Sequence, residues 1–256
     1  MNAISPTRSH VVARVGALLR AVGSAEPGGA STTELGKATD LARPTAHRLL
    51  TSLAEEGLID RDLETGRWRL GPELYLLGVG AANRYDISDQ AHDVLIRLAR
   101  ETGESAFLSA RRGDETVCLL WEEGSFPLRS HVLHEGIRFP LGVASAGLSI
   151  LSHLPDRDVD DYFSRMNPEK DWGPAHSEEK IRERIRSTKR TGYGVNPALI
   201  VDGSWGIGAA VFDRTGRPAW ALSLTGVQTR FRDDRIHEMG VLLLEQAHLL
   251  SVRLKS

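Results

Sequence analysis

The chain has 256 residues, which is more than one typical domain and less than two large ones. Its 41% hydrophobic and 26% charged residues are a globular composition and exclude a disordered or collagen-like chain. With 32 basic and 34 acidic residues the net charge is -2, so any binding of nucleic acid must come from positive charge that is concentrated locally.

No apolar run approaches the roughly 20 residues that span a bilayer, and the first residues lack the apolar core and cleavage site of a secretory signal. We therefore expect a cytoplasmic protein without a membrane partner. The single cysteine, Cys118, excludes an internal disulfide, a CxxC redox motif and a cysteine-based zinc site. It lies in the apolar stretch TVCLLW, which favours a buried small hydrophobe over a nucleophile.

Three helices are predicted near the start of the chain. Apolar residues recur at three- and four-residue spacings over residues 10–22, which is typical of an amphipathic helix. Ser31 and Glu34 form a capping box that begins a short second helix. The third helix begins around Pro44, which is tolerated in a first turn because the N–H it lacks would have no intrahelical partner. It ends at Gly57.

A β-hairpin is predicted next, from strands at residues 58–62 and 67–70 around a turn in which Gly66 supplies the positive φ. The order helix, helix, tight turn, helix and hairpin is that of a winged helix-turn-helix. In that fold the third helix fits into the major groove of DNA. We therefore predict a DNA-binding domain over residues 1–71.

Residues 72–82 are apolar on all sides of a predicted helix, which indicates packing against a second copy of the chain. We take residues 72–86 as a linker and dimerisation helix. The rest of the chain, residues 87–256, combines antiparallel strands with grouped helices, so the fold class is α+β. Helices are predicted at 87–103, 146–154, 156–166, 178–192 and 233–254, and strands or extended segments at 104–111, 115–122, 129–141, 207–213 and 218–227.

At this level the sequence resembles the IclR family of bacterial transcriptional regulators. The segments that carry the resemblance occur in family order and cover nearly the whole chain: residues 32–62, 66–78, 136–151, 192–213 and 218–226. The resemblance implies an N-terminal winged helix-turn-helix and a dimerising linker helix. It also implies that residues 87–256 form a GAF-like domain with an antiparallel sheet that binds a small-molecule effector.

Candidate DNA contacts lie on the third helix and the wing. Over residues 1–80 basic and acidic residues are equal in number, but the third helix has no acid before Glu55. Its polar side chains can reach phosphates or base edges, and a wing arginine can reach a phosphate. The predicted DNA-binding residues are Arg43, Thr45, His47, Arg48 and Arg67.

Matching the family's ligand-binding positions gives a second candidate site, which comprises Ser145, Ala146, Asn196, Gly206, Ser223 and Thr225. Backbone N–H groups at a helix N-terminus favour an anion, and the Ser223 and Thr225 hydroxyls fall on one side of a strand. We expect Leu133 and Trp205 to lie under the chain or ring of the ligand, with Trp121 and Trp220 as further wall candidates. A small organic acid, aromatic acids included, fits such a site.

Two alternatives are weighed against this interpretation. Residues 143–147, VASAG, approach the G-x-S-x-G nucleophile elbow of a hydrolase, but Val143 replaces the glycine that the strained turn needs. A ligand-binding module without a DNA role is the other alternative.

His131 and His134 come nearest to a metal pair, yet on an extended segment they point to opposite faces. We expect no metal, no cofactor and no enzymatic activity.

The sequence thus predicts a homodimer, or a dimer of dimers, that binds double-stranded DNA. Two-fold symmetry in the protein demands matching half-sites, so the operator should be pseudo-palindromic. The function that the resemblance implies is a transcriptional regulator, with repression of a catabolic operon under control of a small organic-acid effector as the expectation.

Overall fold

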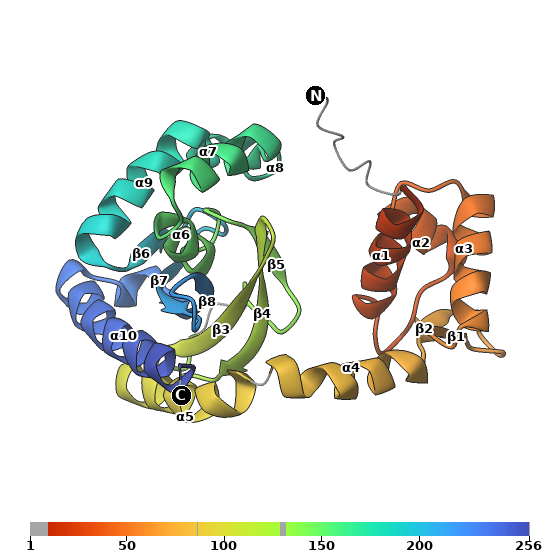
Figure 1. The fold of residues 1–256 in the computed structure, drawn as a ribbon, viewed down its shortest axis with the longest axis horizontal. Coiled ribbons are helices and arrows are strands. Elements are labelled where there is room, and N and C mark those ends of the chain that lie inside the picture. The colour runs from red at the N-terminus through yellow and green to blue at the C-terminus, as the bar shows by residue number, and fades with distance from the viewer. Residues whose placement is uncertain (1–9, 86, 129–131, 256) are drawn as a thin grey trace. The chain divides into compact units, whose positions relative to one another are not determined.

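The computed structural model describes residues 10–85, 87–128 and 132–255. The chain forms two compact units, Met1–Tyr85 and Asp86–Ser256 (Figure 1). Within the described residues, no helix has both the length and the apolar composition that crossing a membrane requires.

The first unit is the predicted winged helix-turn-helix followed by the linker helix. Its elements are α1 (His10–Gly23), α2 (Thr32–Ala38), α3 (Arg43–Glu55), β1 (Ile59–Arg61), β2 (Trp68–Leu70) and α4 (Pro72–Tyr85). The apolar faces of α1, α2 and α3 meet the hairpin in one core, which contains Leu18, Val22, Leu35, Leu50, Leu53, Ile59 and Trp68. The predicted capping box is present, because Glu34 accepts from Ser31 N at 2.7 Å and Ser31 Oγ accepts from Glu34 N at 3.3 Å.

The second unit is an α+β domain around a six-stranded antiparallel sheet in the order β5-β4-β3-β8-β7-β6. The strands are β3 (Ser105–Arg112), β4 (Glu115–Glu122), β5 (Arg138–Pro140), β6 (Gly194–Pro197), β7 (Ser204–Phe212) and β8 (Pro218–Val227). The helices are α5 (Ile87–Thr102), α6 (Ser145–Ser152), α7 (Asp156–Arg165), α8 (Pro168–Trp172), α9 (Glu178–Thr191) and α10 (Asp233–Arg253), with short 3-10 turns at Pro174–His176 and Gln228–Arg230.

Several elements differ from the sequence prediction, and the five-residue helix α8 was not predicted at all. Of the extended stretch predicted at 129–141, only Arg138–Pro140 pairs as a strand, and residues 129–131 lie outside the described residues. Strand β6 was not predicted, because it is a four-residue edge strand that ends in Pro197 and has no apolar alternation. Strand β7 begins at Ser204, three residues earlier than predicted, since its first residues pair with the end of β8.

The two faces of the sheet have different neighbours, because successive side chains on a strand point to opposite faces. One face forms the main apolar core with α5 and α10, through residues that include Leu108, Ile207, Ala209, Leu222 and Leu224. The other face packs against α6 and carries Gly206, Gly208, Ser223 and Thr225. The predicted placement of the Ser223 and Thr225 hydroxyls on one side is confirmed, since they pair in register with Gly208 and Gly206.

Candidate DNA-binding and effector sites

Helix α3 presents a polar face opposite its buried one. Arg43, His47 and Arg48 are exposed and Thr45 is half-buried, whereas Ala46, Leu50 and Leu53 are buried in the domain core. The N-cap residue Ala42 makes no side-chain hydrogen bond. Pro44 has no N–H and the N–H of Thr45 donates to Ala42 O at 2.9 Å, so the first turn of α3 offers an anion few backbone donors. The His47 ring also lies edge-on to Trp68, with ring centroids 6.4 Å apart.

A surface hollow of about 360 Å³ lies at the turn between α2 and α3, lined by Thr33, Gly36, Lys37, Asp40, Leu41, Ala42 and Arg43. Gly36 allows the tight turn, because a Cβ there would lie 2.9 Å from Leu41 O. Lys37 and Arg43 place two cations at this hollow. Sequence reasoning did not select Lys37, although its place at the end of α2, just before the turn, could have drawn attention to it.

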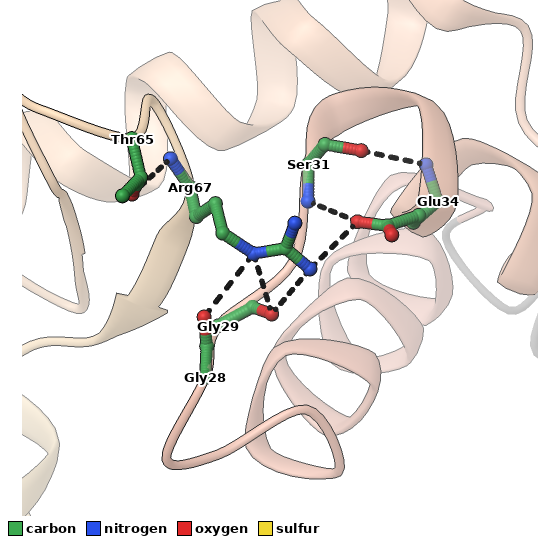
Figure 2. A network of polar contacts seen from close by, with 6 residues as sticks. All are labelled: Gly28, Gly29, Ser31, Glu34, Thr65 and Arg67. Carbon is green, nitrogen blue, oxygen red and sulfur yellow. Dashed lines mark hydrogen bonds and ion pairs between the residues drawn. The ribbon is translucent and has the colours of Figure 1, made fainter.

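The partly exposed side chain of Arg67 is held by contacts within the domain (Figure 2). Its Nε donates to Gly28 O and Gly29 O, each at 3.1 Å, and its Nη2 donates to Gly29 O at 3.0 Å. Nη2 also pairs with Glu34 Oε2 at 3.0 Å, the same oxygen that caps Ser31 N. The guanidinium thus ties the wing to the start of α2. The phosphate contact predicted for Arg67 stays a prediction, and it competes with this network.

An Arg67→Ala variant separates the two roles. Loss of the internal network should lower the free energy of unfolding by about 1–2 kcal/mol, because a typical hydrogen bond contributes about 0.5–1.5 kcal/mol, and water screens both the hydrogen bonds and the ion pair of this partly exposed guanidinium. The salt dependence of operator binding should stay as in the wild type. Arg69→Ala is the matched control, because Arg69 lies only within 3.9 Å of Asp62. Unchanged melting together with a salt slope reduced by about one would instead show a phosphate contact.

The candidate effector pocket of the second unit opens between α6, β7, β8 and the loops beside them. Its lining residues are Val132, Leu133, Ala144, Ser145, Asn196, Ile200, Ser204, Trp205, Gly206 and Thr225. Six of the eight predicted effector residues line it: Leu133, Ser145, Asn196, Trp205, Gly206 and Thr225. Sequence reasoning missed Val132, Ala144, Ile200 and Ser204, which lie on loops or beside them without a periodic pattern. The enclosed space of about 20 Å³ holds about one water molecule, so a larger ligand must spread the walls.

Two of the predicted effector residues, and two of the tryptophans, do not line this pocket. Ala146 is buried among the apolar residues that pack around α6, and Ser223 is completely buried in the sheet face beneath it. Trp121 stacks on Phe107 instead, with ring centroids 6.1 Å apart, and Trp220 packs against the main core. The wall role suggested for both tryptophans is therefore wrong.

Two glycines of β7 allow α6 to lie directly on the sheet. A Cβ at Gly208 would lie 2.8 Å from Ser145 O and 2.9 Å from Ala146 N, and one at Gly206 would lie 3.2 Å from Ser145 Oγ. Ser149 fastens the same helix, since its Oγ lies 2.6 Å from Gly208 O and accepts from Gly194 N at 3.2 Å. The N-terminus of α6 is thereby held at the pocket.

Three buried polar atoms at this site lack a hydrogen-bond partner among the described residues: Trp205 Nε1, Ser223 Oγ and Thr225 Oγ1. A buried donor or acceptor left unpaired costs about 1–3 kcal/mol, and such groups are rare in folded proteins. Trp205 and Thr225 both line the pocket. The α6 N-terminus beside them has no side-chain cap either. The site therefore offers hydrogen-bonding groups that a polar ligand can satisfy.

Asn196 has a different place in the pocket. Its Nδ2 donates to Val143 O at 2.7 Å, and its Oδ1 accepts from Leu199 N at 3.0 Å. Both ends of the amide are thus engaged within the protein, and Asn196 joins β6 to the loop that precedes α6. Its direct contact with an effector stays a prediction.

The histidines and the cysteine considered as metal ligands and as a nucleophile have the following surroundings. Over residues 10–85, 87–128 and 132–255, no group of three or more His, Cys, Asp or Glu side chains could hold a metal ion. His131 lies outside these residues, and His134 Nδ1 lies 3.0 Å from Glu135 O. Burial raises the pKa of Cys118 to about 12, so its thiolate is not accessible at neutral pH.

A winged helix-turn-helix joined to a domain with a pocket for a small polar molecule defines a ligand-responsive DNA-binding regulator. The chain matches the model of the IclR helix-turn-helix domain over residues 11–63 and that of the bacterial transcriptional regulator IclR C-terminal domain over residues 79–252. It therefore belongs to the IclR family of bacterial transcriptional regulators.

Two curated relatives and one solved structure illustrate the likeness. The HTH-type transcriptional regulator KipR of Bacillus subtilis is 30% identical over 205 residues, which cover 80% of this chain and 81% of KipR. The transcriptional repressor IclR of Escherichia coli is 24% identical over 226 residues, covering 86% and 81% of the two chains. An IclR homologue from Microbacterium hydrocarbonoxydans, solved with 4-hydroxybenzoate, shares the fold with a TM-score of 0.76 at 21% identity, covering 96% of this chain and 99% of that one.

Proposed function

We propose that this protein is a repressor that binds its operator through α3 and changes its DNA affinity when a small organic acid enters the pocket of the second unit. The observation that carries the proposal is the set of unpaired polar atoms beside the uncapped N-terminus of α6, among them Trp205 Nε1 and Thr225 Oγ1 of two residues that line the pocket. Because these groups include N–H and hydroxyl donors, an anion with hydrogen-bond acceptors satisfies them. A regulator of this kind acts on DNA in the cytoplasm.

Aromatic acids belong to the proposed class. Leu133, Ile200 and Trp205 supply an apolar wall for a ring or chain. The homologue solved with 4-hydroxybenzoate supports the same class, and the relative named a repressor supports repression.

The test is a gel shift on the DNA upstream of the protein's own gene, with a calorimetric screen of acetate, pyruvate, benzoate and 4-hydroxybenzoate alongside their amides. We expect a sequence-dependent shift that one of the acids alters. A protein that gives no shift and hydrolyses small esters would support the hydrolase alternative. A protein that binds an acid but no DNA would be a ligand-binding module.

Substitutions in the pocket should remove the response to effector while operator affinity without effector stays near wild type. Thr225→Val removes a hydroxyl that belongs to a pocket residue and has no partner among the described residues, so the variant should be at least as stable as the wild type. Gly206→Leu fills the space beside Ser145 Oγ. Calorimetry with the acid from the screen, followed by the gel shift, measures both effects. Normal responses in both variants would show that the effector binds elsewhere.

A dimer, or a dimer of dimers, follows from α4. Tyr75, Leu76, Leu77 and Val79 are all more than half exposed within the first unit, and such a continuous apolar surface marks an interaction site. We propose that a second copy of the chain covers it, which pairs two recognition helices and requires a pseudo-palindromic operator.

Leu77→Asp should split the dimer and abolish cooperative binding to an operator with two half-sites, because a charge in an apolar interface loses its hydration without gaining a partner. Light scattering at micromolar concentration checks the mass. Leu63→Asp is the control, since Leu63 is 98% exposed at the tip of the wing, away from α4. A monomeric wild type would refute both the dimer and the two-fold operator.

A further inference from the structure

The loop before α6, residues 141–144, is held by side chains from three other elements. Tyr162 OH of α7 donates to Leu141 O at 2.5 Å, and Asn196 Nδ2 of β6 donates to Val143 O at 2.7 Å. Between these two bonds, Arg184 Nη2 of α9 lies 3.4 Å from Gly142 O. Since this loop leads into the pocket residues Ala144 and Ser145, the three donors set the position of the pocket wall.

Arg184 is the charged member of this set. The nearest acid that acts on it is its neighbour Glu183, whose charge raises the pKa of Arg184 but whose carboxylate pairs with Lys180 at 3.2 Å. The Arg184 guanidinium donates to two backbone carbonyls, Ala175 O at 2.8 Å and Gly142 O, and no carboxylate of a described residue lies within 4 Å of it. Burial lowers the pKa of Arg184, although a guanidinium stays protonated at neutral pH. By contrast, Arg182 on the same helix pairs with Asp160 at 2.7 Å and Glu178 at 2.8 Å.

The histidine beside this guanidinium is neutral, and protein lies between the guanidinium and the pocket. His176 is completely buried, and its pKa is lowered by burial and by the charge of Arg184, so its imidazole is neutral at pH 7. Only Val143 separates Gly142 from Ala144, and two steps of about 3.8 Å along the chain place the carbonyl that Arg184 contacts within ~8 Å of the pocket wall. With the 3.4 Å from the Arg184 guanidinium to that carbonyl added, the charge lies within ~12 Å of the wall. This is well below the Debye length of ~30 Å at 0.01 M salt, and the intervening space is protein.

The pocket itself holds no charged side chain among the described residues. Anion recognition from within it rests on hydroxyl, indole and backbone donors alone. We propose that Arg184 supplies the missing charge: it selects anionic over neutral effectors from behind the 141–144 loop, without touching the ligand. This rests on the proposed function of the pocket as an organic-acid site, and it makes Arg184 a specificity-determining residue that acts through the wall.

The test is calorimetry on the full-length protein at low salt, with benzoate and 4-hydroxybenzoate as anionic probes and benzamide and 4-hydroxybenzamide as neutral ones. Arg184→Gln should weaken binding of the acids about tenfold and leave binding of the amides unchanged. Arg184→Lys keeps the charge and should restore most of the affinity for the acids. Arg182→Gln, on the same helix but paired with carboxylates, should bind all four probes as the wild type does.

Three results would overturn the proposal. Acid binding unchanged in Arg184→Gln would show that the charge is not felt in the pocket. Equal losses of acid and amide, or equal losses in the Gln and Lys variants, would show that Arg184 only supports the loop. If the wild type bound the amides but none of the acids, the proposed organic-acid effector would be wrong as well. The first two results, by contrast, contradict only the role of Arg184.

Discussion

Replacing Gly208 by alanine should abolish the effector response and destabilise the second unit. The added Cβ would lie 2.8 Å from the carbonyl carbon and oxygen of Ser145 and 2.9 Å from Ala146 N. These are backbone atoms of α6, so no side-chain rotation relieves the contact, and the helix must move off the sheet. Inserting a carbon into such a packed contact costs about 1–3 kcal/mol, and the displaced N-terminus of α6 would no longer meet the pocket.

Thermal melting and calorimetry with the acid from the screen measure the two effects of Gly208→Ala. Gly206→Ala is the matched control two residues earlier on the same strand. Its Cβ would come closest to the Ser145 hydroxyl, at 3.2 Å, which can rotate away, and its 3.5 Å distances to Leu224 O and Thr225 Cγ2 are ordinary contacts. We expect a small change in stability there. If Gly208→Ala melted and bound the acid like the wild type, α6 would not be held as the structure has it.

Removing Arg43 and Arg48 together should weaken operator binding at least ~30-fold, since each interaction with a base or phosphate contributes about 1–3 kcal/mol. Folding should be unaffected, because both side chains are exposed and the buried face of α3 consists of Ala46, Leu50 and Leu53. Gel shifts at several salt concentrations, together with melting curves, provide the measurement.

The single variants distinguish two kinds of interaction with DNA. If an arginine reads a base, its removal relaxes specificity at one position of the operator. If it binds a phosphate, its removal weakens binding to all sequences and lowers the salt slope by about one. Arg97→Ala is the control, because Arg97 is exposed on α5 in the other unit and pairs only with Glu101. Wild-type binding by the double variant would remove α3 from the DNA interface.

Residue patterns within short segments of the sequence were enough to predict most of the helices and strands and the order of the domains. The spacing of apolar residues predicts α1 and α3, and the Ser31 and Glu34 capping box predicts the start of α2, because these signals act within one or two helical turns. Alternation along β8 likewise placed Ser223 and Thr225 on one face, since the side-chain period of a strand is independent of its neighbours.

Tertiary structure alone decided which polar groups are already engaged. Arg67 and Asn196 are surface-type residues by sequence, yet their partners lie 33 to 53 positions away, at Glu34 and Val143. The same holds for Arg184, whose hydrogen bond with Gly142 spans 42 residues. No periodic pattern encodes such pairs. They form only when packing brings distant segments together, and polar groups that leave water then take the hydrogen-bond partners that packing places beside them. The sequence by itself determined where a DNA-binding helix and a pocket lie, and packing determined which of their side chains remain available to a ligand.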